Sequence, residues 1–89
     1  MQIEFDKSFS KSLDKIKEND ILKKIENVIY HIDEAESLSQ IKNVKKLVGF
    51  KKYYRIRIGE YRLGFELIDS QTIKFIIICH RKNIYNVFP

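Results

Sequence analysis

The hydrophobic and polar residues of this 89-residue chain change their period once, near the middle of the sequence. At the N-terminus, Ile3 and Phe5 alternate with polar residues, and this pattern predicts a short strand. Asp6 follows directly, and its carboxylate can accept the free N–H groups at the start of a helix. The first residues therefore predict a strand that leads into a capped helix.

Two helical segments come next, because apolar residues recur at helical spacing from Phe9 to Ile16 and again from Ile21 to Ile32. Asn19 and Asp20 interrupt the pattern, and they can cap the second helix. The connection is so short that the two helices must form an αα-hairpin. Burying each large apolar side chain contributes roughly 1.5–3 kcal/mol, so the stripe on the second helix must face a core.

The segment of residues 37–52 is ambiguous. It can hold a helical turn followed by a strand that begins near Val44. Lysines are frequent in this segment, which indicates an exposed basic edge: Lys42, Lys45, Lys46, Lys51 and Lys52.

From Tyr53 onward the period is two, which is typical of strands. Residues 53–58 and 61–67 alternate on either side of Gly59-Glu60, and a glycine in the first turn position favours a type II′ hairpin. Residues 72–79 form a third strand that is apolar on both faces in its second half, as in a central strand. The order β-α-α-β-β-β predicts one α+β domain over residues 1–89. In it the αα-hairpin packs on one face of a small antiparallel sheet.

Charge and composition narrow the range of partners. Lysine and arginine total 17 against 12 acidic residues, a formal net charge of +5, which suits a polyanionic partner or only aids solubility. The single cysteine, Cys79, excludes an intramolecular disulfide, and its apolar surroundings indicate a core residue. The longest apolar run, Phe75 to Cys79, is far shorter than the roughly 20 residues of a membrane span. We therefore expect a cytoplasmic protein without a membrane partner.

Three arginines should gather on one face of the sheet. Period two places Arg55 and Arg57 on the same side of their strand, and the hairpin register places Arg62 beside them, opposite the helices. His80, Arg81 and Tyr85 follow the last strand, and we expect them at the rim of this face. Clustered guanidinium groups with few nearby acids favour a bound anion. The alternative is that they are ordinary solvated positions of an amphipathic sheet.

Such a face can support the cleavage of RNA. Metal-ligand clusters and a Gly-rich phosphate loop are both missing from the sequence, so we expect neither a metal nor a cofactor. An RNA strand brings its own nucleophile, the 2′-hydroxyl. Arginines can stabilise charge on the pentacovalent phosphate, while other groups must accept and donate protons. Tyr53 and Tyr85 can stack an unpaired base, and His80 is the side chain here that titrates near neutrality.

The runs LVGFKKYYRIRIGEYRLGFELI and IKFIIICHRKNIYNVFP resemble the RelE/ParE superfamily, the toxins of bacterial toxin–antitoxin pairs. The hairpin YRIRIGEYRL and the tail HRKNIY carry most of this likeness. With the helical hairpin it covers essentially the whole chain and implies a RelE-like fold. In the RelE-like branch, basic residues on the first hairpin strand orient mRNA. Those positions are Arg55 and Arg57, and we add Lys52 and Tyr53 beside them as substrate-binding candidates.

The resemblance also implies catalytic roles for residues near the C-terminus. The positions of Arg62 and Arg81 stabilise the phosphate in the transition state, and that of Tyr85 stacks or transfers a proton. The branch often has lysine where Arg55 and Arg57 stand, and one such lysine has been proposed as the general base. Arginine is a poor proton acceptor, so the general base stays open. His80 occupies a position that varies in the family, and its catalytic role is a hypothesis.

The implied activity is a metal-independent, ribosome-dependent mRNA endonuclease that inhibits translation. The 2′-hydroxyl attacks the scissile phosphate and leaves a 2′,3′-cyclic phosphate. The implied partners are a cognate antitoxin, the ribosome and mRNA. Two alternatives keep the same fold: a ParE-like toxin that poisons DNA gyrase, and a non-catalytic module that only binds RNA.

Overall fold

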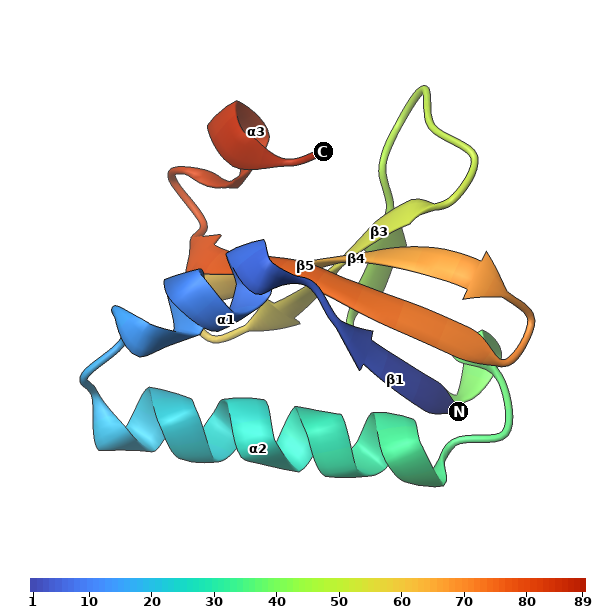
Figure 1. Ribbon diagram of the computed structural model, residues 1–89, viewed down its shortest axis with the longest axis horizontal. Helices are drawn as coiled ribbons and strands as arrows, with labels where there is room; N and C mark the ends of the chain where they lie inside the picture. The colour runs from blue at the N-terminus through green and yellow to red at the C-terminus, as the bar shows by residue number, and fades with distance from the viewer.

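Two helices cover one face of a five-stranded sheet, and a short C-terminal helix lies on the opposite side (Figure 1). The computed structural model describes all residues, 1–89. In chain order the elements are β1 (Gln2–Phe5), α1 (Lys7–Asp14), α2 (Asn19–Glu34), the 3-10 helix η1 (Leu38–Gln40), β2 (Val44–Lys46), β3 (Tyr53–Ile58), β4 (Tyr61–Asp69), β5 (Thr72–His80) and α3 (Ile84–Val87). None of the helices has the length and apolar composition that a membrane crossing requires.

The starts of the two long helices differ in how they are capped. The carboxylate of Asp6 accepts a hydrogen bond of 3.1 Å from the backbone N–H of Ser8, which confirms the predicted cap of α1. The cap predicted for α2 is wrong. Asn19 is already the first residue of α2, and Glu18 precedes it without a side-chain hydrogen bond. Asn19 and Asp20 are exposed, and water commonly satisfies the free N–H groups at an exposed helix start.

The sheet is mixed and has the order β1-β5-β4-β3-β2. The strands from β2 to β5 are antiparallel as predicted, and β5 lies inside the sheet between β1 and β4. The expectation of a wholly antiparallel sheet is wrong, because β1 runs parallel to β5, with Ile3 opposite Ile73. The αα-hairpin between β1 and the later strands is a connection long enough to allow this parallel pairing.

The ambiguous segment, residues 37–52, contains both of the elements that the sequence suggested. A helical turn, η1, precedes the short strand β2, which begins at Val44 and pairs with β3. At Gly59 the backbone has a φ of +58°, while Glu60 keeps a negative φ, as the predicted type II′ turn requires. Strand β2 forms the sheet edge opposite β1.

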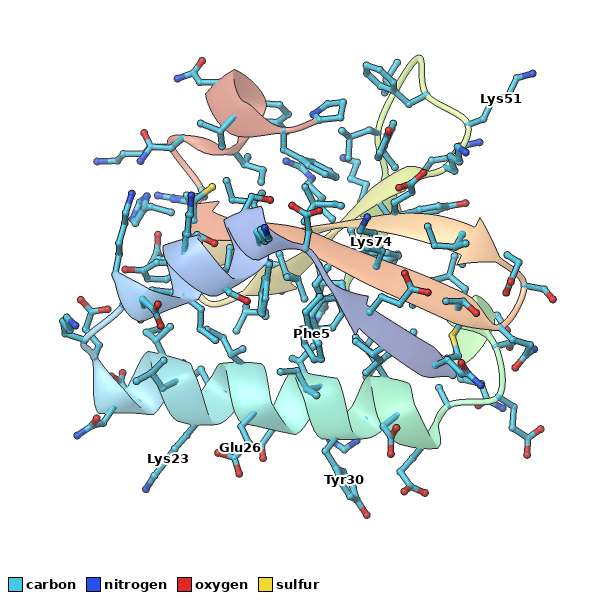
Figure 2. The ribbon with its side chains drawn as sticks, in the orientation of Figure 1. Phe5, Lys23, Glu26, Tyr30, Lys51 and Lys74 are labelled. Carbon is cyan, nitrogen blue, oxygen red and sulfur yellow. The ribbon has the colours of Figure 1, made fainter.

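The core lies between the helices and the sheet. It contains eleven buried apolar residues: Phe9, Ile16, Ile25, Ile32, Ile56, Ile58, Leu63, Phe65, Ile73, Phe75 and Ile78. Figure 2 shows Lys23, Glu26 and Tyr30 on the opposite side of α2, pointing away from the sheet. The predicted apolar stripe of α2 therefore faces the core, and its polar side faces solvent.

The C-terminal residues fold back over the other face of the sheet. Ile84 and Phe88 are buried there, with exposed fractions of 2% and 4%. The sequence predicted only a short tail at this point, whereas residues 84–87 form the helix α3. The face opposite α1 and α2 is thus divided into a part covered by the C-terminal segment and a part occupied by charged side chains.

Candidate functional site

The strand register brings the predicted arginines together. Arg57 lies directly opposite Arg62 across the β3–β4 hairpin, and Arg55 lies opposite Lys45 of β2. The residues between them, Ile56 and Leu63, are buried under the helices. Because side chains alternate along a strand, the cations all project from the face that α1 and α2 leave free. We call this surface the arginine face.

A pocket of about 450 Å³ opens on the arginine face. It is lined by six residues: Asn43, Val44, Lys45, Arg55, Arg57 and Arg62. Four of the six are cations, and no acidic side chain lines the pocket. Asn43 adopts a left-handed φ of 63° at the corner before β2, a conformation that asparagine tolerates better than most residues. We call this surface the basic pocket.

Arg62 is the most constrained of these cations. Its Nη1 atom donates hydrogen bonds of 2.9 Å to the carbonyl oxygens of Gly59 and Tyr61. Partial burial lowers the pKa of the Arg62 guanidinium, repulsion from Arg55, Arg57 and Arg81 lowers it further, and Glu60 opposes this. An arginine remains protonated despite such a shift. Because neighbouring cations repel the Arg62 guanidinium and only Glu60 opposes them, a bound anion would stabilise the site.

Arg81 lies at the rim, where it pairs with the hairpin turn. Its Nε atom is 2.8 Å from the Glu60 Oε2 atom, and its backbone N–H donates to the Glu60 carbonyl oxygen. Both side chains are more than half exposed. Exposed ion pairs contribute about 0–1 kcal/mol, so an incoming phosphate can take the place of Glu60 at little cost.

Tyr85 reaches the site from α3. Its hydroxyl oxygen accepts a hydrogen bond from Nη1 of Arg55, and the guanidinium carbon lies 4.9 Å from the centre of the tyrosine ring. The ring is 71% exposed, so most of its surface is free for another partner. Tyr85 therefore sits where the sequence placed it, at the rim of the arginine face.

Lys52 and Tyr53 lie beside the basic pocket and do not line it. The Lys52 ammonium is 3.4 Å from the carboxylate of Glu66. The ring of Tyr53 packs edge-on against Phe50 and Phe88, with 5.7 Å between centroids in both pairs. Tyr53 is thus partly engaged by other rings, and its role in stacking a base stays a prediction.

His80 is not on the arginine face, and the expectation that it reaches this rim is wrong. It pairs with Tyr61 across β4 and β5, and the two rings are 5.8 Å apart. The Tyr61 hydroxyl in turn donates to Glu18, just before α2. Strand β5 continues through His80, so the period of two carries its side chain to the helix side. The residue before it, Cys79, takes the position opposite Arg62.

Cys79 is half-buried, and burial raises the pKa of its thiol. The thiol is therefore protonated at neutral pH, which agrees with a packing residue better than with a nucleophile.

Asn43 and Lys45 line the basic pocket as well. The sequence indicated Lys45 only as part of an exposed basic edge, and no pattern in the sequence distinguished Asn43. Lys45 lies opposite Arg55 in the register of β2 and β3, and alternation within a single strand does not give this pairing.

Comparisons with known proteins agree with this fold. Residues 3–85 match the family model described as the ParE toxin of a type II toxin–antitoxin system, parDE. Toxin RelE3 of Methanocaldococcus jannaschii is 40% identical over 90 residues and aligns over the full length of both chains.

Solved structures show the same architecture. The toxin of the RelB–RelE antitoxin–toxin complex from Methanococcus jannaschii superposes with a TM-score of 0.80 and 38% identity, over 97% of this chain and 99% of that one. The intact RelBE toxin–antitoxin complex of E. coli shares the fold, with a TM-score of 0.68 and 21% identity over 89% of this chain and 94% of that one. The chain belongs to the RelE/ParE family, and it is a type II toxin with the RelE-like fold.

Proposed function

We propose that this toxin is a metal-independent, ribosome-dependent mRNA endonuclease. One observation carries the proposal: the basic pocket holds three guanidinium groups and one ammonium without an acid among them. Such a group of donors fits a phosphodiester whose negative charge grows in the transition state.

The reaction uses the nucleophile that RNA supplies. The 2′-hydroxyl oxygen attacks the adjacent phosphorus, the bond to the 5′-oxygen breaks, and a 2′,3′-cyclic phosphate forms. One proton leaves the 2′-hydroxyl and another reaches the 5′-oxygen. Arg62 and Arg81 stabilise the pentacovalent phosphate, Arg55 and Arg57 hold the strand, and Tyr85 stacks a base or transfers a proton. The guanidinium groups cannot accept the proton, so exact positioning of mRNA by the ribosome supplies much of the rate.

The proposed protein partner is a cognate antitoxin. The relatives from Methanococcus jannaschii and E. coli were both solved as complexes with RelB. By analogy, an antitoxin with an acidic or amphipathic segment binds this chain, whose net charge is +5.

A second candidate function is the poisoning of DNA gyrase. The match of residues 3–85 to the ParE family model favours it. That function has no evident need for Arg62 in the basic pocket together with Arg81 and Tyr85 at the rim of the arginine face, and for this reason we prefer RNA cleavage.

Primer-extension mapping of mRNA on translating ribosomes tests the proposal. We expect cleavage by the wild-type toxin and a loss of roughly 10²-fold or more in Arg62→Ala and Arg81→Ala, because each removes a cation from the transition state. Lys23→Ala is the matched control, since it removes one exposed positive charge from the outer side of α2 (Figure 2). Circular dichroism checks that each variant is folded.

Three outcomes would contradict the proposal. Full cleavage by both arginine variants would remove their catalytic role. DNA-damage signalling with intact mRNA would select the gyrase poison. Strongly salt-dependent RNA binding without cleavage on ribosomes would select a non-catalytic RNA-binding module.

A further inference from the structure

We propose that a second pocket, between the β2–β3 loop and the C-terminal segment, binds one unpaired nucleobase of the RNA strand. This inference deepens the proposed function, because it assumes that RNA occupies the neighbouring basic pocket. Figure 1 shows that the β2–β3 loop and α3 both rise from the sheet on the side away from α2. The pocket has a volume of about 490 Å³, and most of its wall is apolar: Leu47, Val48, Phe50, Tyr85, Phe88 and Pro89. We call it the apolar pocket.

The apolar pocket adjoins the basic pocket. Lys45 and Arg55 line both of them. A strand whose phosphate is held by Arg55 in the basic pocket therefore has an adjacent nucleotide beside the apolar pocket. Adjacent sites for phosphate and base are what recognition of single-stranded RNA requires.

Several large apolar side chains beside the apolar pocket are exposed to solvent and do not belong to the hydrophobic core. Seven large hydrophobic residues of the chain are exposed, and four of them belong to this loop and α3: Val48, Phe50, Tyr85 and Val87. Val48 is 94% exposed. Apolar residues gathered on the surface and bordered by charge commonly mark a binding site.

The aromatic walls are held in place before any ligand arrives. Phe50 packs against Tyr53, which packs against Phe88, so the loop and the C-terminal segment are joined through three rings. On the other side, the guanidinium of Arg55 holds Tyr85. Walls ordered in this way lose little conformational entropy when a flat base enters between them.

Size and charge favour a nucleobase as the occupant. The pocket volume lies within the range of about 300–1,000 Å³ that is usual for small-molecule sites, and it therefore admits a single base. Lys45 and Lys46 line the pocket, and Lys51 extends outward from the same loop (Figure 2). These amines can contact flanking phosphates while the base occupies the apolar interior.

A stacking measurement on an uncleavable RNA tests the inference. The probe is a series of short 2′-O-methyl RNA oligonucleotides, each with one 2-aminopurine, whose fluorescence is quenched when the base stacks on an aromatic ring. We expect the wild-type protein to quench one position of the series. Phe50→Ala should lose this quenching and bind RNA roughly 5- to 100-fold more weakly.

Two further variants control for folding and for general surface effects. Val48→Glu changes a side chain that is almost fully exposed, and its negative charge should weaken RNA binding and reduce quenching without unfolding the protein. Ile68→Ala is the matched control, because Ile68 and Phe50 are both 43% exposed and Ile68 lies at the far end of β4. It should quench and bind RNA as the wild type does.

The outcomes separate this inference from the proposed function. Wild-type quenching in Phe50→Ala and Val48→Glu, or none at any position in the wild type, overturns the base site even where ribosomal cleavage is observed. Position-specific quenching that depends on Phe50 supports the base site even where Arg62→Ala leaves cleavage unchanged. Loss of antitoxin binding in both variants with RNA binding intact assigns the apolar pocket to a protein partner and overturns the inference.

Discussion

A Cβ atom at Gly64 would lie 2.8 Å from the ring of Phe88. Carbon atoms in contact are normally about 3.5–4 Å apart, so only a glycine allows the ring to approach the backbone of β4 this closely. The side of Gly64 that Phe88 covers is the arginine face, because Gly64 lies opposite Arg55 in the sheet. This contact holds the C-terminal segment against the sheet. Because Tyr85 lies in α3, which directly precedes Phe88, the contact also helps to position Tyr85.

We predict that Gly64→Ala displaces Phe88 and α3 without unfolding the domain. Overpacking of this kind costs about 1–3 kcal/mol, so the free energy of unfolding should fall by that amount. Cleavage should also fall, because Tyr85 moves away from Arg55. Denaturant titration and primer extension measure the two effects.

A double variant provides the control for the Gly64 prediction. Phe88→Leu shortens the side chain, so Gly64→Ala should cost less in its presence than in the wild type. Strictly additive losses of stability would show that the methyl group does not act through Phe88.

The ion pair between Arg81 and Glu60 leads to a second prediction. Glu60→Gln removes a carboxylate that competes with phosphate for Arg81 and opposes the repulsion on Arg62. RNA should therefore bind more tightly to this variant, and the gain should shrink as salt rises. The unfolding free energy should change by no more than about 1 kcal/mol, since the pair is exposed. Binding of an uncleavable RNA at two salt concentrations measures the effect.

Glu4→Gln changes the net charge by the same amount on an exposed position of β1, and β1 is the sheet edge opposite β2. A general electrostatic effect would raise RNA affinity equally in both variants. An equal rise, or weaker binding in Glu60→Gln, would show that Glu60 does not compete with RNA for Arg81.

The periodic parts of the fold could be predicted from the sequence, and the remaining parts depend on information that periodicity does not contain. The αα-hairpin and the β3–β4 hairpin follow from helical spacing, alternation and the Gly59 turn. The direction of β1 could not be predicted, because alternating side chains look the same in parallel and antiparallel strands. Helix α3 has four residues, too few to show a helical period.

The candidate site also contains residues whose positions periodicity predicts and residues whose positions it does not. Alternation was sufficient to place Arg55, Arg57 and Arg62 on one face. It misplaced His80 because the strand was expected to end one residue earlier, at Cys79. The pairing of Arg81 with Glu60 depends on side-chain conformations in three dimensions, which no local pattern encodes.

The position of His80 leads to a third prediction. His80→Gln should leave both the rate of ribosomal cleavage and its pH profile unchanged, because the imidazole lies beside Tyr61 on the helix side of the sheet. Primer-extension rates measured from about pH 5.5 to 8.5 give both quantities. If the variant loses one limb of the pH profile within this range, His80 transfers a proton in the reaction.

The cap of α1 leads to a prediction about acid stability. Hydrogen bonds from the hydroxyl and the backbone N–H of Ser8, with attraction to Lys74, lower the pKa of the Asp6 carboxyl below its ordinary value of 3.8. Since the pKa is lower in the folded protein than in the unfolded chain, the carboxylate contributes stability above the unfolded value and loses it as the pH falls through the folded one. Asp6→Ala should therefore be less stable than the wild type at neutral pH, and the difference should shrink below about pH 4. Urea titrations at several pH values measure this difference, with Asp20→Ala as the control because the Asp20 carboxylate accepts no such hydrogen bond. A difference that stays constant down to acid pH would mean that the ionised carboxylate of Asp6 does not stabilise the helix.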